Sequence, residues 1–185
     1  MNHFGLTGKS ILITGSTSGI GFEMSKEFNK SGASLNLLGR DQKKIDSLEQ
    51  LLENKLSTKF IKGDLNKDLD YIASQIDCLD GIVFNAGIVD YKPLKFIDET
   101  DFLKLFHTNY FSSIYLLKKL IKKRKINKSA SIVFISSLSS TIGIPGTLAY
   151  SASKASIDSS VKVLASELSK NKSRIPENPK IIPND

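Results

Sequence analysis

The chain has 185 residues, 40% of them hydrophobic and 24% charged, which is typical of a single soluble globular domain. Its one cysteine, Cys78, excludes an intramolecular disulfide and favours a reducing compartment, so we expect a cytoplasmic protein. The apolar runs are only a few residues long and predict neither a signal peptide nor a membrane span.

The positive charge is concentrated between residues 118 and 128. This run has no acidic residue and contains seven basic ones: Lys118, Lys119, Lys122, Lys123, Arg124, Lys125 and Lys128. These seven charges equal the net charge of +7, so the rest of the chain is balanced. Cations at the end of a helix interact favourably with the negative end of its dipole. We therefore predict a solvated helix end rather than a surface for nucleic acid or a membrane.

Strand-like and helix-like segments alternate along the chain, which predicts an α/β fold with a parallel sheet. Apolar runs predict strands at 10–14, 34–38, 59–62, 81–84 and 131–135. Helices are expected at 19–30, after an N-cap at Asp41, at 66–75, over a long segment from Phe102 to the basic run, and at 150–168. Residues 1–169 form the predicted domain, and the polar, proline-containing segment 170–185 is interpreted as a tail.

A glycine-rich turn joins the first predicted strand to the first predicted helix. It reads Thr14-Gly15-Ser16-Thr17-Ser18-Gly19-Ile20-Gly21. Its glycines allow, in order, a tight turn, a close approach to a pyrophosphate, and close packing of the helix on the sheet. The amide groups and the positive end of the helix then face an anion. Taken alone, the motif is also compatible with a turn that binds nothing.

The spacing Gly-x3-Gly-x-Gly after a threonine resembles the short-chain dehydrogenase/reductase family. This resemblance implies a doubly wound, Rossmann-like parallel sheet in strand order 3-2-1-4-5 and an NAD(P) cofactor. It also implies that the residues between the glycines take part in cofactor binding, namely Ser16, Thr17, Ser18 and Ile20.

The second predicted strand is followed by Gly39 and Arg40, at the place where such a fold distinguishes its cofactors. An acid there accepts hydrogen bonds from a ribose 2′-OH, whereas arginine pairs with a 2′-phosphate. Gly39 stands where NAD-preferring family members usually have the acid. The sequence therefore favours NADP, with NAD still possible. The alternative is that Arg40 is a surface residue that caps the next turn.

Two further segments after strands match the family. Asp64, followed by Leu65, is similar to the family acid that binds the adenine amino group, although N-capping of a helix is an equally physical role. The segment Asn85-Ala86-Gly87 matches the family's Asn-Ala-Gly signature, in which small residues let the backbone lie against the cofactor. The amide of Asn85 is expected to tie neighbouring strands together.

Four polar residues match the family's catalytic tetrad in order and spacing: Asn109, Ser137, Tyr150 and Lys154. Tyr150 and Lys154 are four residues apart near a helix start, so they project to one side. In this resemblance, Tyr150 exchanges a proton with a carbonyl or alcohol oxygen, and Ser137 hydrogen-bonds that oxygen. Lys154 favours the phenolate of Tyr150 and binds cofactor ribose, and Asn109 holds a water linking Lys154 to solvent. No cluster of residues has metal-ligand spacing, so no metal is expected.

We therefore predict an NADP-dependent oxidoreductase that interconverts a carbonyl and a secondary alcohol. One alternative is a truncated, inactive cofactor-binding or interaction protein, and another is an epimerase or dehydratase of the family's extended branch. Family chains usually continue into a sixth and seventh strand, which residues 170–185 do not resemble. With these strands missing, the fifth strand becomes an unpaired edge, and self-association is expected.

Overall fold

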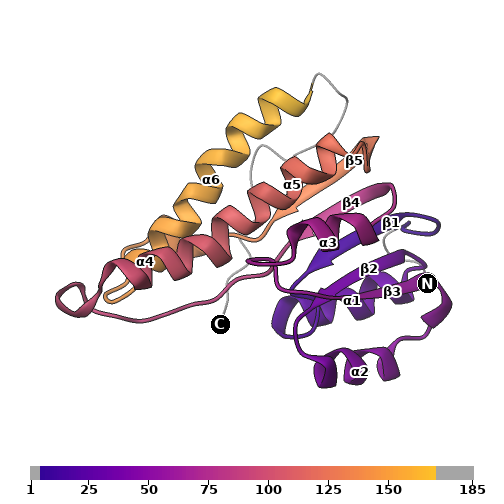
Figure 1. Ribbon diagram of the computed structural model, residues 1–185, viewed down its shortest axis with the longest axis horizontal. Coiled ribbons are helices and arrows are strands. Elements are labelled where there is room, and N and C mark those ends of the chain that lie inside the picture. The colour runs from indigo at the N-terminus through magenta and orange to yellow at the C-terminus, as the bar shows by residue number, and fades with distance from the viewer. Residues whose placement is uncertain (1–4, 170–185) are drawn as a thin grey trace.

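The computed structural model describes residues 5–169 and contains one five-stranded parallel sheet (Figure 1). The strand order is β3-β2-β1-β4-β5, which confirms the predicted topology. The strands are β1 (Ser10–Thr14), β2 (Ser34–Gly39), β3 (Thr58–Lys62), β4 (Leu79–Phe84) and β5 (Ile126–Phe134). The predicted tail at 170–185 lies outside the described residues.

Helices cover both faces of the sheet. Figure 1 shows α1 (Gly19–Lys30) and α2 (Gln42–Leu51) on one face and α3 (Leu69–Gln75), α5 (Ser112–Lys122) and α6 (Leu148–Ser169) on the other. Helix α4 (Glu99–Phe106) precedes α5. Single turns of 3-10 helix occur at Lys55–Ser57, Leu94–Phe96 and Leu138–Ser140.

The strand residues alternate between two hydrophobic cores. In β1, Ile11 and Ile13 pack with Leu48 of α2, whereas Leu12 packs with Leu116 of α5 and residues of α3 and α6. This alternation follows from the two-residue period of a strand. Because both faces are buried, the strands read as nearly continuous apolar runs, as parallel strands do.

The long helix expected from Phe102 onward is interrupted. A π-helical segment, His107–Phe111, separates α4 from α5 and contains the predicted catalytic residue Asn109. Such π segments are short and frequently lie at functional sites. The expectation of one regular helix was therefore wrong at this point.

Strand β5 begins five residues earlier than predicted. Ile126 pairs with Leu79 across an irregularity, and regular pairing resumes at Ser131 opposite Gly81. The early part of the strand is mostly polar and exposed, from Asn127 to Ser129, so it lacks the apolar signal of a buried strand.

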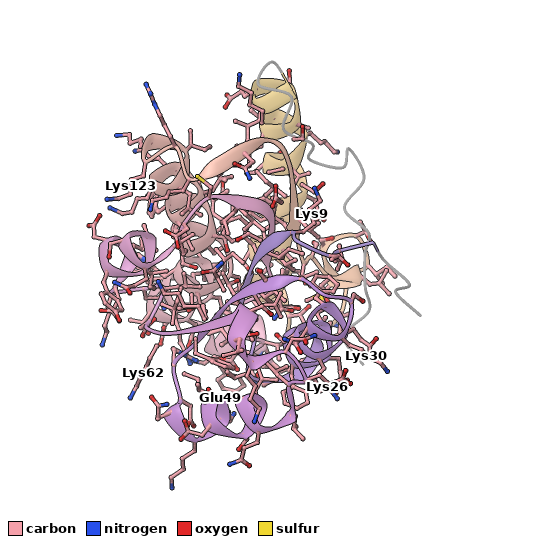
Figure 2. All side chains as sticks on the ribbon, turned by 90° about the vertical axis from the view of Figure 1, so that its right-hand side faces the viewer. Lys9, Lys26, Lys30, Glu49, Lys62 and Lys123 are labelled. Carbon is pink, nitrogen blue, oxygen red and sulfur yellow. The ribbon has the colours of Figure 1, made fainter. Side chains whose placement is uncertain are left out.

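Most of the basic run lies at the carboxyl end of α5, as predicted, whereas Lys128 lies in β5. Lys119 and Lys122 are in the last helical turn, and the Lys119 ammonium lies 2.6 Å from the Asp70 carboxylate of α3. Figure 2 shows Lys123 at the periphery of the molecule. Within residues 5–169, no helix is long and apolar enough to cross a membrane.

Candidate active site

The glycine-rich turn packs so tightly that side chains are excluded from two of its positions. A Cβ on Gly15, whose φ is +64°, would lie 2.8 Å from the Ala86 Cα. A Cβ on Gly21 would overlap the Gly15 carbonyl and lie 2.5 Å from the Asn85 amide nitrogen. Real Cβ atoms do not approach other atoms this closely, so these positions require glycine for space.

The open side of the same turn presents backbone to the cavity. Gly19 has φ +52°, and apart from its chain neighbours and the backbone of its own helix no atom lies within 4 Å of the place its Cβ would take. Ser18, the N-cap of α1, makes no capping bond with its side chain. The first amide groups of α1 are therefore left without a side-chain cap, an arrangement suited to a phosphate group.

Thr14 and Asn85 join the carboxyl ends of the two central strands. The Thr14 hydroxyl accepts hydrogen bonds from the backbone amides of Asn85 and Ala86, at 3.0 and 3.1 Å. In return, the Asn85 amide donates to the carbonyl oxygens of Thr14 and Gly15, at 3.2 and 3.1 Å. The predicted tie between strands is confirmed, and it holds the glycine-rich turn against the Asn-Ala-Gly segment.

A cavity of about 300 Å³ lies at these strand ends. Its lining includes most of the predicted cofactor-binding residues: Gly15, Thr17, Ser18, Gly19, Ile20, Arg40, Asp64, Leu65, Asn85, Ala86 and Gly87. Ser16 and Gly21 are buried behind it, where the Ser16 hydroxyl donates to the Leu38 carbonyl at 3.1 Å. The glycine cradle and the carboxyl-end location fit a dinucleotide.

Positive charge gathers where β2 enters α2. Arg40 and Lys44 both line the cavity. The only acid of this turn, Asp41, caps α2 as predicted, because its carboxylate accepts hydrogen bonds from the amides of Lys43 and Lys44 at 2.9 and 3.3 Å. Lys44 is a lining residue that sequence reasoning missed. Its place in the first turn of α2, next to Arg40, was the available signal.

Asp64 does not cap a helix. Its carboxylate accepts a hydrogen bond from the Asn66 amide at 2.9 Å, which closes a local turn. Helix α3 begins later, at Leu69, with Asp68 at its N-cap position. The capping role considered from the sequence was therefore wrong, and a contact to adenine stays a prediction.

The side-chain amide of Asn109 forms hydrogen bonds to the backbone of Ile88 and to the Ser153 hydroxyl. Its amide oxygen accepts from the Ile88 backbone amide at 2.8 Å. Its amide nitrogen donates to the Ile88 carbonyl at 2.9 Å and to the Ser153 hydroxyl at 3.0 Å. Both N–H groups are thus used inside the protein, and only the oxygen retains an unused lone pair. Ser153, which sequence reasoning missed, links this network to α6.

Lys154 is a buried cation whose partners are few. Its ammonium donates to the Ile135 carbonyl at 2.8 Å and lies 6.0 Å from the centre of the Tyr150 ring. Burial lowers the pKa of Lys154 to about 8, while the nearby Asp158 carboxylate opposes that change. Asp158, one helical turn further along α6, was not singled out from the sequence.

Two of the predicted catalytic residues, Asn109 and Lys154, converge beside Gly87. A Cβ built on Gly87 would lie 3.3 Å from the Asn109 amide oxygen and 3.5 Å from the Lys154 ammonium. Tyr150 is buried at the start of α6 in a small cluster with Leu105. Ser137 is the N-cap of the 3-10 turn that packs on α6, and its hydroxyl oxygen accepts from the Ser139 amide at 3.2 Å. The hydroxyl oxygens of Ser137 and Ser139 lie 3.1 Å apart, and either can be the donor of that hydrogen bond.

Comparisons with known proteins agree with this geometry. A family model described as short chain dehydrogenase matches residues 9–177. The chain is 32% identical over 164 residues to a 3-oxoacyl-(acyl-carrier-protein) reductase of Rickettsia felis, covering 88% of this chain and 68% of that protein. It is 33% identical to dehydrogenase/reductase SDR family member 7B of Xenopus laevis, covering 86% and 53%.

Solved structures show the same architecture. A short chain dehydrogenase/reductase family protein superposes with a TM-score of 0.83 at 30% identity, covering 92% of this chain and 72% of that one. A glucose/ribitol dehydrogenase from Brucella melitensis superposes with a TM-score of 0.87 at 26% identity, covering 92% and 71%.

Proposed function

This chain belongs to the short-chain dehydrogenase/reductase family, and we propose that it is an NADP(H)-dependent oxidoreductase that interconverts a carbonyl and a secondary alcohol. The observation that carries the proposal is the convergence of Asn109 and Lys154 beside Gly87, next to the glycine-lined cavity. The relatives of this chain are named as oxidoreductases, which does not favour the alternative that it is an inactive cofactor-binding or interaction protein.

The preference for NADP over NAD is supported by charge. Gly39 offers no acid to a ribose 2′-OH, while Arg40 and Lys44 line the same cavity as Gly39. The carboxylate of Asp41, which lines the same cavity, accepts the capping hydrogen bonds of α2. A 2′-phosphate would be held by Arg40, with Lys44 adding a second positive charge.

The protein groups place and protonate the substrate. When bound, the reduced nicotinamide supplies a hydride to the carbonyl carbon. Tyr150 donates its proton to the carbonyl oxygen, and the hydroxyl of Ser137 hydrogen-bonds that oxygen. Lys154 stabilises the resulting phenolate electrostatically. Asn109 fixes the backbone at Ile88 and the start of α6, and a water relay to Lys154 would use the remaining lone pair of its amide oxygen.

The substrate is proposed to be a small molecule with a ketone. Relatives named 3-oxoacyl-(acyl-carrier-protein) reductases make 3-oxoacyl thioesters the first compounds to test. We place the reaction in the cytoplasm, since one cysteine in the chain is consistent with a reducing compartment. We also propose self-association, because Tyr115 of α5 and Val163 of α6 are large apolar residues that are about half exposed.

A coupled binding and turnover experiment tests this function. NADPH binding is followed by fluorescence, and oxidation of NADPH is followed with a panel of ketones and 3-oxoacyl thioesters. Tyr150→Phe removes the proton donor, so turnover is expected to fall about 10²–10⁴-fold while NADPH affinity changes by less than about twofold. Undiminished turnover in Tyr150→Phe would refute the assignment. Absence of NADPH binding by the unaltered chain would refute the function itself.

A further inference from the structure

The glycine at the end of β2 is required for space rather than for backbone conformation. The φ angle of Gly39 lies outside the left-handed region. A Cβ at this position would lie 2.6 Å from Cγ2 and 3.3 Å from Oγ1 of Thr17, and 3.3 Å from Cγ1 of Ile45. Thr17, from the glycine-rich turn, therefore occupies the place where any side chain at position 39 would begin.

Thr17 is poorly able to move out of the way. Its side chain is branched at Cβ, and both heavy branches point toward Gly39. The Thr17 side chain has three staggered rotamers. Only one of them replaces the methyl group, now 2.6 Å from the Cβ site of residue 39, by a hydrogen. That rotamer moves the methyl group to the present position of Oγ1, which is 3.3 Å from the same site and still crowded. A Cβ at position 39 must then displace the glycine-rich turn or α2, because Ile45 closes the other side.

The space matters because an acid at position 39 is the group that would recognise a ribose 2′-OH. Such a carboxylate starts from the Cβ that Thr17 excludes. Arg40 and Lys44 put two cations on the surrounding cavity wall, where the Asp41 carboxylate accepts the capping hydrogen bonds of α2. Steric exclusion of an acid at position 39 keeps a second carboxylate away from Arg40 and Lys44.

We propose that Thr17 is a specificity-determining residue of the cofactor site. Its branched side chain excludes an acidic residue at position 39 and so keeps the end of the site that meets the ribose 2′-substituent suited to a phosphate. The inference rests on the proposed NADP preference and extends it from Arg40 to a residue of the glycine-rich turn. One consequence is that Gly39→Asp alone does not convert the site to NADH.

Cofactor binding provides the first test, by fluorescence titration with NADPH and NADH. Gly39→Asp is expected to weaken binding of both cofactors at least tenfold, because the turn is displaced. Adding Thr17→Ala should restore NADH affinity at least tenfold, while NADPH stays weak through repulsion between the new carboxylate and the 2′-phosphate. Thr17→Val keeps both branches and serves as the matched control, so Thr17→Val with Gly39→Asp should behave like Gly39→Asp alone.

Thermal stability without cofactor provides a second test that does not depend on the function. Gly39→Ala adds only the Cβ and is expected to lower Tm by about 4 °C or more. Thr17→Ala should recover at least half of that loss, and Thr17→Val should recover none. Strong NADH binding by Gly39→Asp with Thr17 intact, or equal Tm losses in all three Thr17 backgrounds, would overturn the inference. Equal affinity of the unaltered chain for NADPH and NADH would instead overturn the proposed NADP preference.

Discussion

In the glycine-rich turn the cavity is shaped by backbone and by missing side chains, whereas around Asn109 and Lys154 it is shaped by buried polar side chains. Gly15 and Gly21 have no room for a Cβ, and Gly19 leaves its side of the turn open. Asn109, by contrast, makes three hydrogen bonds that join Ile88 of the segment after β4 to Ser153 of α6.

The two regions illustrate two ways in which a protein can fix the positions of the groups that line a cavity. The glycine-rich turn positions its amide groups by close packing, so a substitution there is tolerated only if the added atoms fit into the space available. The region around Asn109 and Lys154 positions side chains by satisfying their hydrogen bonds, so its tolerance of substitutions depends on how many partners remain. A substitution should therefore fail for different reasons in the two regions.

The largest effect is expected where space is tightest. Gly21→Ala would push its Cβ into the Gly15 carbonyl and the Asn85 amide, neither of which can move without breaking the strand tie. We expect a loss of more than about 3 kcal/mol in the free energy of unfolding, measured with urea. Gly19→Ala is the control, since it strains only φ and should cost about 1 kcal/mol. Equal losses at the two positions would contradict a packing role for Gly21.

The buried charge of Lys154 should produce the next largest effect, and it depends on pH. Its pKa falls from 10.5 in the unfolded chain to about 8 in the folded one. Between these values the unfolded chain binds more protons, so the free energy of unfolding rises with pH. The cost of the buried charge is fully present below pH 8 and is relieved by up to about 3 kcal/mol as pH approaches 10.5.

Lys154→Met removes this titration. Urea unfolding from pH 7 to 10 should show the unaltered chain gaining stability relative to the variant, with most of the gain above pH 8. Lys162→Met, on the exposed side of α6, controls for the loss of a surface charge. A difference between Lys154→Met and the unaltered chain that is constant with pH would show that Lys154 is not destabilised by burial.

The smallest effect is expected from one hydrogen bond of the Asn109 network. Ser153→Ala removes the acceptor of an Asn109 N–H and leaves that buried group unpaired, at a cost of about 1–2 kcal/mol. Ser156→Ala, on the same helix, loses only a bond to the Ala152 carbonyl and should change stability by less than about 0.5 kcal/mol. If turnover falls in Ser153→Ala but not in Ser156→Ala, the network positions Asn109 for the reaction.

Local signals in the sequence were sufficient to predict most of the residues that line the cavity. The apolar runs gave β1 its observed bounds and placed Arg40 and Asn85 at strand ends, and the N-cap at Asp41 was also confirmed. These features depend on neighbours in the chain, such as a strand followed by glycines or a cap followed by a helix. The parallel order of the strands then brings the motifs to one edge.

The missed features depend on contacts between distant segments. The apolar period of the long helix continues through His107–Phe111, so nothing local reveals the π segment. Ser153 and Asp158 matter through Asn109 and Lys154, and serine and aspartate on a helix are ordinary surface residues in sequence. The contact of Thr17 with Gly39 joins two turns that are separate along the chain, and only the fold shows it.

The hydroxyl of Thr14 has a consequence for amide hydrogen exchange. It accepts the backbone amides of Asn85 and Ala86 from within β1, beyond the last ladder pair of β1 and β4, Ile13 with Val83. These two protons can exchange with solvent only when the ends of β1 and β4 separate, so their rates report on opening of the sheet centre rather than on loop motion. An anion that binds the glycine-rich turn would then slow exchange at Asn85 and Ala86 by stabilising the joined strands.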